Sequence, residues 1–333
     1  MPRKKFQSRK ETPWDDMSSK TPTQEFLTNQ FKSTYDRKHP VLNTTAENVL
    51  INSFVPDCCP FCGVIHIVKK GMTSNGVQRY KCYGCGKSFT PVSGTIFDGH
   101  KISITEWTEY LLNIFRYVSL NAGSWNNRNA FTTSRYWLEK LFLVLEDQNS
   151  GVVLSGDVWL DETYYSVRTS DIVKTASGKK LRGISQNQLC IGVACTKSRI
   201  ICILEGTGRP SKMKTYNAFH SHIEPGSTLI HDKDKAHSLL ISRLGLKDQW
   251  YDSKVIKALP DKENPLNRVN QVHARLKDFL NAHSSFNRDS LQGYLNVFSF
   301  AMNPPRGYLE KVDALLNLTF KVHKTLRYRD FYS

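Results

Sequence analysis

The chain has 333 residues, of which 39% are hydrophobic and 23% are charged, and these proportions are typical of a soluble globular protein with two or three modules. It contains no run of about eighteen apolar residues, and its first residues form no apolar signal segment, so we expect neither a membrane span nor secretion. The formal net charge of +16 favours a polyanionic partner such as nucleic acid, although charge alone does not separate DNA from RNA.

Residues 1–50 are polar and begin with an excess of positive charge. We expect a flexible basic arm here that adds salt-sensitive contacts to phosphate groups, although a solvated tail without a role fits the composition equally well. A short helix over 45–54 would lead into the next module. The uncompensated basic residues among the first ten are Arg3, Lys4, Lys5, Arg9 and Lys10.

Residues 51–100 contain two pairs of cysteines. Each pair encloses two residues, each is followed by a glycine, and nineteen residues separate the pairs. This spacing predicts a zinc ribbon, with strands at 65–68 and 77–81 and a structural Zn²⁺ held by four thiolates; a pair of disulfides is the alternative, which a cytosolic setting disfavours. Cys58 lies next to the first pair but does not preserve the two-residue gap. The expected ligands are Cys59, Cys62, Cys82 and Cys85.

Residues 101–148 have a helical pattern. Ser103 is a suitable cap for a first helix, Asn121–Gly123 is expected to break it, and a second helix is expected from Thr132 or Thr133. Two helices joined by a polar segment suggest a helix-turn-helix-like DNA-binding module, and a plain helical linker is the alternative. The groups that would face DNA are Arg128, Ser134, Arg135 and Lys140.

Residues 149–333 change to strands that alternate with helices, which predicts an α/β fold with a ribonuclease-H-like mixed sheet as the catalytic domain. A basic segment at 168–187 either follows substrate DNA or is a solvated hairpin. An aromatic-rich amphipathic helix is expected at 286–303. The other expected strands are 153–167, 189–196, 199–206 and 227–231, and the other expected helices are 212–223, 235–244 and 267–283.

Two aspartates end short apolar runs in this region. Asp161 follows Val158–Leu160, and Asp232 closes a run that starts at Thr228. Carboxylates at the ends of neighbouring strands can share hard divalent cations, so we expect Mg²⁺ or Mn²⁺ to be the catalytic cofactor. Glu162 would face the other side of its strand.

Several neighbours of these aspartates are weaker candidates. Asp234 competes with Asp232 but does not directly end the strand. His231 and His237 are better explained as structural or DNA-contacting groups than as metal ligands. Asp157 stands at the start of its strand, as a strand-start or salt-bridge residue.

The helix expected at 267–283 supplies the remaining candidates. Asn270, His273 and Lys277 share a helical face, because they are three and seven residues apart. The Asn270 carbonyl can be a metal ligand, the His273 ring could orient water or phosphate, and Lys277 can hold a phosphate as a point charge. Glu263 and Asp278 are the fallback third acids, although neither has the helical phase of Asn270.

These motifs resemble those of an insertion-sequence transposase of the DDE class, in the insertion-sequence-1595 group with an ISXO-type catalytic domain. The phrases WLDETYY, LIHDKDKAH and NRVNQVHARLK carry the resemblance, with CPFCG…CYGCGKSF running into GTIFDGHKISITEW ahead of them. It covers roughly residues 55–305. It implies that Asp161 and Asp232 form the acidic pair, that Asn270 stands at the usual glutamate position, and that Lys277 follows seven residues later. Most DDE enzymes have a carboxylate where Asn270 stands, but the Asn-plus-Lys variant occurs within this group.

The resemblance implies a transposase that cuts DNA at transposon ends and joins the freed 3′-hydroxyl to target DNA, without a covalent enzyme intermediate. The partners would be the terminal repeats, the target DNA and at least one further copy of the chain, and the protein would be cytoplasmic, nucleoid-associated and prokaryotic. Two alternatives remain open. One is a catalytically inactive, transposase-derived DNA-binding regulator, and the other is a ribonuclease-H-fold nuclease that cuts without joining.

Overall fold

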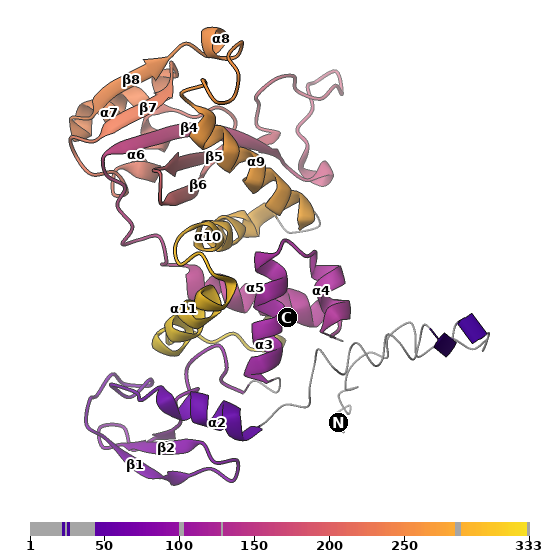
Figure 1. The fold of residues 1–333 in the computed structure, drawn as a ribbon, viewed down its shortest axis with the longest axis vertical. Coiled ribbons are helices and arrows are strands. Elements are labelled where there is room, and N and C mark those ends of the chain that lie inside the picture. The colour runs from indigo at the N-terminus through magenta and orange to yellow at the C-terminus, as the bar shows by residue number, and fades with distance from the viewer. Residues whose placement is uncertain are drawn as a thin grey trace. The chain divides into compact units, whose positions relative to one another are not determined.

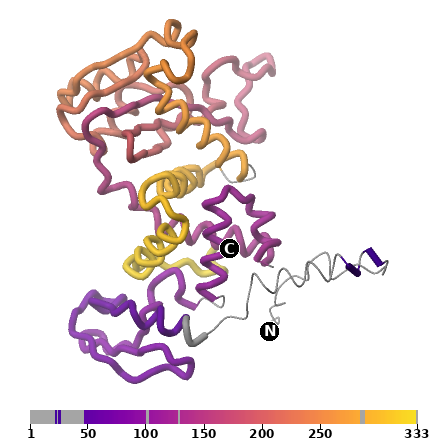
Figure 2. The backbone as a smooth tube through the Cα atoms, in the orientation of Figure 1, coloured from indigo at the N-terminus to yellow at the C-terminus, as the bar shows by residue number. Residues whose placement is uncertain are grey.

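The computed structural model describes residues 22–23, 25–26, 44–99, 103–127, 129–283 and 288–331. The chain divides into two compact units (Figures 1 and 2). The first joins residues before Leu141 to residues from Tyr308 onward, and the second is Leu141–Gly307. Most of the basic arm expected at 1–50 lies outside the described residues, as does Arg128.

The first unit begins with helix α2 (Thr44–Ser53) and a three-stranded antiparallel sheet in the order β1-β2-β3. A tight turn joins the first two strands, and Gly76 takes a φ of 78° there, which only glycine adopts readily. Asn52 of α2 fastens the helix to this turn: its side chain donates to Gly76 O at 3.0 Å and accepts from Gln78 N at 2.8 Å. The strands are β1 (Ile67–Met72), β2 (Gln78–Cys82) and β3 (Ser88–Phe89).

Three helices follow, α3 (Ile104–Phe115), α4 (Leu120–Asn126) and α5 (Phe131–Leu145). Ser103 caps α3 as expected, since its hydroxyl accepts from Glu106 N at 3.1 Å. The break expected at Asn121–Gly123 is wrong, because these residues lie inside α4. The chain turns earlier, where Tyr117 has a φ of 59°, and the Ser119 hydroxyl then accepts from Ala122 N to start α4.

The burial of side chains on α5 shows that part of the set of residues expected to face DNA is wrong. Ser134 and Lys140 are both buried, and Lys140 Nζ donates to Ile96 O at 2.5 Å. Burial lowers the Lys140 pKa to about 8. α5 packs through Trp137 onto Trp107 of α3, with ring centroids 5.6 Å apart. Neither Ser134 nor Lys140 therefore faces solvent, whereas Arg135 is exposed.

Residues 308–331, which were expected in the catalytic domain, pack in the first unit. They form α11 (Tyr308–Lys321) and α12 (Tyr328–Phe331). Phe320 stacks on Phe54, with ring centroids 3.9 Å apart. Tyr136 donates from its hydroxyl to Leu326 O at 2.5 Å. The first unit is thus assembled from two segments far apart in the sequence.

The second unit contains a five-stranded sheet in the order β6-β5-β4-β7-β8. β4, β5 and β6 form an antiparallel meander, while β7 and β8 run parallel to β4. This is the mixed sheet that the sequence predicts, with β8 as an additional strand. The strands are β4 (Asp157–Ser166), β5 (Gln188–Cys195), β6 (Ile200–Thr207), β7 (Thr228–Asp232) and β8 (Lys247–Tyr251).

Helices pack on both faces of this sheet. On one face, Val158 and Leu160 of β4 enter a core with Phe219 and Leu240, which belong to α6 and α7. α9 and α10 pack on the other face, against β4, β5 and β6. The helices are α6 (Lys212–Phe219), α7 (Ser238–Leu244), α8 (Ser253–Ile256), α9 (Asn267–Ala282) and α10 (Leu291–Met302).

α10 covers the outer edge of the sheet. Alternate backbone N–H groups of β6 have no strand partner on that side, and side chains of α10 accept from them instead. Ile200 N donates to Asn303 Oδ1 at 2.7 Å, just beyond the helix, and Leu204 N donates to Gln292 Oε1 at 2.8 Å. Covering an edge in this way prevents it from pairing with another chain.

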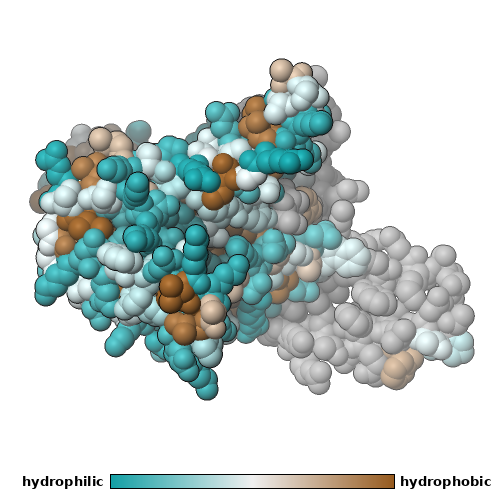
Figure 3. Space-filling model, turned by 90° about the horizontal axis from the view of Figure 1, so that it is seen from above, coloured by the Kyte–Doolittle hydropathy of each residue, from teal (hydrophilic) through white to brown (hydrophobic). Residues whose placement is uncertain are grey.

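The surface seen in Figure 3 is mainly hydrophilic, and its apolar residues form small, separate groups. None of the helices in the described ranges combines the length and the apolar content that crossing a bilayer requires.

Candidate active site

Two neighbouring parallel strands inside the sheet bring Asp161 and Asp232 to adjacent positions. The register of β4 and β7 pairs Leu160 with His231, so the next position on each strand is an aspartate. Leu160 points toward α6 and α7, and successive side chains of a strand alternate, so Asp161 points toward α9. Asp232 is the last residue of β7, as the sequence predicts, whereas Asp161 does not end its strand, because β4 continues to Ser166 through its pairing with β5.

The electrostatics of this pair suit a bound cation. Burial raises the pKa of Asp161 to about 7, and the carboxylates of Asp232 and Glu162 add to the rise. Asp161 Oδ1 accepts from Glu162 N at 2.9 Å, and Asp232 Oδ1 accepts from Asp234 N at 3.0 Å. Within the described ranges, no lysine or arginine forms an ion pair with either aspartate. Two half-buried carboxylates without a protein cation form an oxygen-donor set that fits Mg²⁺ or Mn²⁺.

α9 brings His273 to this pair. His273 Nδ1 lies 3.8 Å from Asp161 Oδ2, and Nε2 is buried without a hydrogen-bond partner among the described residues. Burial lowers the pKa of His273 to about 4, and the charge of Lys277 adds to the effect. The ring is therefore neutral at ordinary pH. It can accept one hydrogen bond and donate another.

Asn270 and Lys277 lie on the same helix as His273 but are exposed. In the described part of the chain, neither side chain is hydrogen-bonded to Asp161 or Asp232. The protein therefore places His273 beside Asp161, and it leaves the amide of Asn270 and the ammonium of Lys277 at the surface, where an added ligand can reach them.

Two contacts fix α9 relative to the sheet. Trp159 of β4 donates from its indole N–H to Pro265 O at 2.9 Å, just before the helix begins. Arg268, in the first turn, donates from Nε to Thr196 O at 3.0 Å, in the hairpin between β5 and β6. These contacts hold the start of the helix at two points of the sheet.

A chain of polar side chains that sequence reasoning did not assemble lies beside the aspartates. Glu162 Oε1 is 3.0 Å from His237 Nε2, His237 Nδ1 is 2.7 Å from His231 Nδ1, and His231 Nε2 is 3.0 Å from Asp248 Oδ1. The alternation of β4 placed Glu162 on this side, as expected. No sequence pattern placed Asp248 near this site, because its strand β8 has almost no apolar residues and was not predicted.

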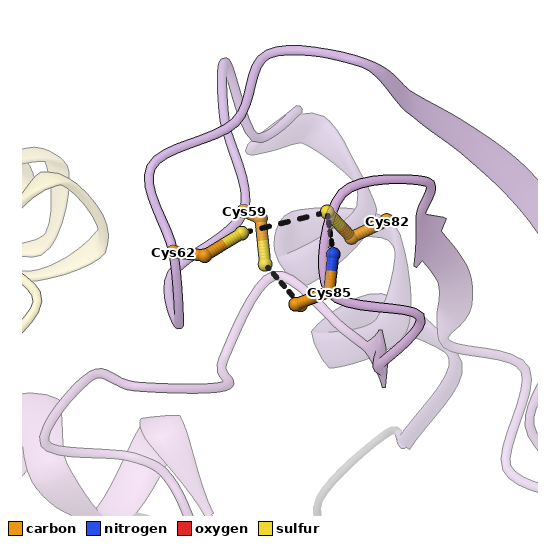
Figure 4. Close-up of side chains that lie close together, drawn as sticks. All are labelled: Cys59, Cys62, Cys82 and Cys85. Atoms are coloured by element: carbon orange, nitrogen blue, oxygen red, sulfur yellow. Dashed lines mark hydrogen bonds between the residues drawn. The ribbon is translucent and has the colours of Figure 1, made fainter.

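The four cysteines of the first unit form a second candidate site (Figure 4). Cys59 Sγ is 3.7 Å from Cys85 Sγ, and Cys62 Sγ is 3.6 Å from Cys82 Sγ. A disulfide requires about 2.05 Å, whereas four thiolates around a tetrahedral Zn²⁺ at about 2.3 Å would lie about 3.8 Å apart. The four thiols, which all lie within 4.8 Å of one another, could therefore hold zinc.

Backbone groups prepare one of these thiols for a metal. Cys85 N donates to Cys82 Sγ at 3.5 Å, and Gly84 N donates to it at 3.3 Å. The hydrogen bond from Cys85 lowers the pKa of the Cys82 thiol to about 7. Cys58 is not a member of the cluster, as its register predicts.

Fold and site together define a two-unit protein with a mixed five-stranded sheet, consistent with a ribonuclease-H-like domain, and with a pair of aspartates on the neighbouring strands β4 and β7. No protein-family model matches the chain, and no curated protein matches it. Among solved structures, the chain is similar to one in a crystal structure of a pre-cleavage Mos1 transpososome. That likeness has 9% identity and a TM-score of 0.25, over 64% of this chain and 76% of the other, and is too weak to carry a functional argument.

Proposed function

We propose that the protein is a DDE-class transposase that cuts DNA at transposon ends and joins them to target DNA. The observation that carries the proposal is the placement of Asp161 and Asp232 on adjacent parallel strands, facing the helix that bears Asn270, His273 and Lys277. The resemblance of the motifs around these residues to those of insertion-sequence transposases supports the same conclusion.

In this proposal, Asp161, Asp232 and Asn270 hold Mg²⁺ or Mn²⁺. When bound, the ions stabilise the attacking and leaving oxygens of the phosphodiester. The exposed ammonium of Lys277 positions a phosphate near the break, as a point charge. His273 is neutral, so it orients water or phosphate through a hydrogen bond and adds no charge to the site.

The first unit is assigned to DNA recognition. Cys59, Cys62, Cys82 and Cys85 hold a structural Zn²⁺ in a ribbon, and all four positions are filled by thiolates, so this site has no open position for catalysis. The ribbon and the helices after it recognise the terminal repeats. Bringing two ends together requires at least a dimer.

The test offers labelled end DNA and a target plasmid with Mg²⁺ or Mn²⁺, and compares wild type with Asp161→Ala, Asp232→Ala and Asn270→Ala. We expect cleaved and joined products, and a loss of roughly a thousandfold or more in the aspartate variants, because a lost metal site forfeits several kcal/mol of transition-state stabilisation. Cleavage without joining would identify a nuclease. Tight DNA binding without any product would identify a regulator.

Asp157→Ala is the matched control. Asp157 is the first residue of the strand that carries Asp161, and its side chain is exposed. The variant removes the same charge from β4, so its activity should stay near that of wild type. Equal losses in both variants would point to a general effect of charge or folding and contradict the assigned site.

A further inference from the structure

Two buried imidazoles face each other behind the aspartate pair. His231 and His237 are almost fully buried, their rings are tilted by 75°, and their Nδ1 atoms are 2.7 Å apart. The Nε2 atom of each ring is 3.0 Å from a carboxylate, Glu162 for His237 and Asp248 for His231. Both outer nitrogens are thus directed at anions.

The two carboxylates favour one arrangement of the ring protons. A carboxylate accepts a hydrogen bond, so each Nε2 carries a proton and donates it. Each neutral ring then has only a lone pair on Nδ1, and two lone pairs 2.7 Å apart repel each other. A positive centre must therefore lie between the two Nδ1 atoms, and it is either a shared proton or a metal ion.

The surrounding groups favour a divalent ion. Asp232 places a carboxylate oxygen within 4.8 Å of both rings, which makes a third donor. Histidine ligands of metal ions commonly donate their other N–H to a carboxylate, which orients the ring and strengthens it as a ligand. Glu162 is such a carboxylate for His237, and Asp248 is such a carboxylate for His231. Nitrogen donors favour Zn²⁺ and its neighbours in the transition series over Mg²⁺.

We infer that His231, His237 and Asp232 form a binding site for a transition-metal ion of the Zn²⁺ class, separate from the four-cysteine cluster. Tetrahedral ligation at about 2.0–2.1 Å separates two nitrogens by about 3.3 Å, so the rings would part by roughly half an ångström to admit the ion. His237 ends a short 3₁₀ turn and His231 is next to the last residue of β7, so neither ring is in the middle of a long helix or strand.

The inference has a consequence for activity, which rests on the proposed function. Asp232 belongs to both the transition-metal site and the proposed Mg²⁺ site. An ion held by His231 and His237 would draw the Asp232 carboxylate away from Mg²⁺. Zn²⁺ in excess of the amount needed by the cysteines should therefore inhibit DNA cleavage, and its removal by a chelator of moderate affinity should restore it.

Binding is tested on the full chain after the cysteines have been loaded with Zn²⁺. Titration with Co²⁺ should produce visible absorption bands of nitrogen and oxygen ligation, without the sulfur-to-metal charge-transfer bands of thiolates. Elemental analysis with Zn²⁺ alone should find one equivalent beyond that held by the cysteines. His231→Gln and His237→Gln should each weaken this second binding by more than about tenfold.

Two further variants keep the test informative. His220→Gln is the matched control, since His220 is an exposed histidine of the same unit and should leave binding unchanged. Asp248→Asn serves if the buried variants fail to fold, because the Asp248 side chain is 48% exposed. It removes the charge behind His231 and should weaken binding by about tenfold.

Three results would overturn the inference. One is the absence of any Co²⁺ or Zn²⁺ binding beyond the cysteines. Another is equal second-site affinity in the His231→Gln and His220→Gln variants. The third is a strongly downfield proton shared by His231 and His237, seen by NMR, that persists at saturating Zn²⁺.

The activity arm separates this inference from the proposed function. If Zn²⁺ binds at the histidines but no cleavage occurs with Mg²⁺, the metal site stands and the transposase proposal fails. Cleavage that Zn²⁺ inhibits to the same relative degree in wild type and in His231→Gln would give the opposite result. The transposase proposal would then stand, and the proposed metal site at His231, His237 and Asp232 would fail.

Discussion

Glu205 of β6 is a carboxylic acid held inside the second unit. Its Oε2 accepts from the Thr215 hydroxyl at 2.9 Å, while Oε1 is buried without a partner among the described residues. Burial raises the pKa of Glu205 to about 7, and the charge of Glu162 adds to the rise. The folded protein therefore favours the protonated acid.

This shift predicts a dependence of stability on pH. The folded pKa is raised, so the contribution of Glu205 is fully present below pH 4.5 and is lost as the pH rises through about 7. Glu205→Gln imitates the protonated acid and should remove up to about 3 kcal/mol of this decline. The free energy of unfolding in urea, measured below and above this window, checks it.

Glu224→Gln is the control for that experiment, because Glu224 is exposed in the same unit. It should leave the slope of stability against pH as in wild type. An unchanged slope in Glu205→Gln would mean that the buried acid ionises at its ordinary pH.

Gly192 makes room for the same carboxyl. A Cβ atom built at Gly192 would lie 2.3 Å from Glu205 Oε1 and 2.6 Å from Phe219 Cε2. Gly192→Ala should therefore destabilise the second unit by about 1–3 kcal/mol, because a well-packed core must move to accept one methyl group. Thermal unfolding followed by circular dichroism would measure this.

Gly151→Ala is the corresponding control, since nothing lies within 4 Å of a Cβ there. Its melting temperature should match that of wild type. A Gly192→Ala protein as stable as Gly151→Ala would show that Glu205 and Phe219 can shift at little cost.

At the scale of elements, strong hydrophobic patterns were predictable and weak ones were not. The strands 189–196 and 199–206 match β5 and β6 to within a residue, because both are apolar runs bounded by turns. β8 was missed, since its side chains are almost all polar and its pairing with β7 is a tertiary contact. The α4 helix was mistaken for a break, because its Asn and Gly content outweighed the serine cap in front of it.

The candidate site likewise contains residues that the sequence predicts and contacts that it does not predict. Asp161 and Asp232 stood out as candidates because each follows a short apolar run, and the spacing along α9 added His273 as a candidate. The contact between Glu162 and His237 was not predictable, since it joins residues 75 positions apart through the packing of one face of the sheet. Burial of Ser134 and Lys140 depends on the aromatic core of the first unit, which no local pattern in α5 reveals.

The cysteine pairs give a prediction at this scale. Cys59→Ser should lower the zinc content of the purified protein and the melting temperature of the first unit, because Cys59 belongs both to the four-thiol cluster and to the small core around Tyr80 and Phe89. Elemental analysis and differential scanning calorimetry are the measurements. Cys58→Ser alters the neighbouring thiol and should change neither quantity. Equal zinc loss in the Cys59→Ser and Cys58→Ser proteins would contradict the assignment of Cys59, rather than Cys58, as the ligand.

At the scale of the whole molecule, the net charge bears on the proposed binding of DNA. The net charge of +16 includes an exposed basic segment between β4 and β5, with Lys174, Lys179, Lys180 and Arg182. We expect the affinity for DNA to fall by about 10³-fold or more between about 50 and 200 mM salt, as for proteins that neutralise several phosphates. Fluorescence anisotropy with a labelled duplex measures the slope of affinity against salt concentration.

A Lys179→Glu, Lys180→Glu protein should show a shallower slope if this segment contacts phosphates. An affinity independent of salt would rule out contacts with the DNA backbone as the main source of the affinity.

The packing of α11 among the first helices has a consequence for how the molecule is made. Since Phe320 stacks on Phe54, the N-terminal unit is interrupted by the whole sheet domain and closes only when residues 308–331 have left the ribosome. During synthesis, the second unit can therefore complete its own core while the first unit still lacks α11 and α12. A protein shortened before Tyr308 would consequently be damaged most in the part translated first.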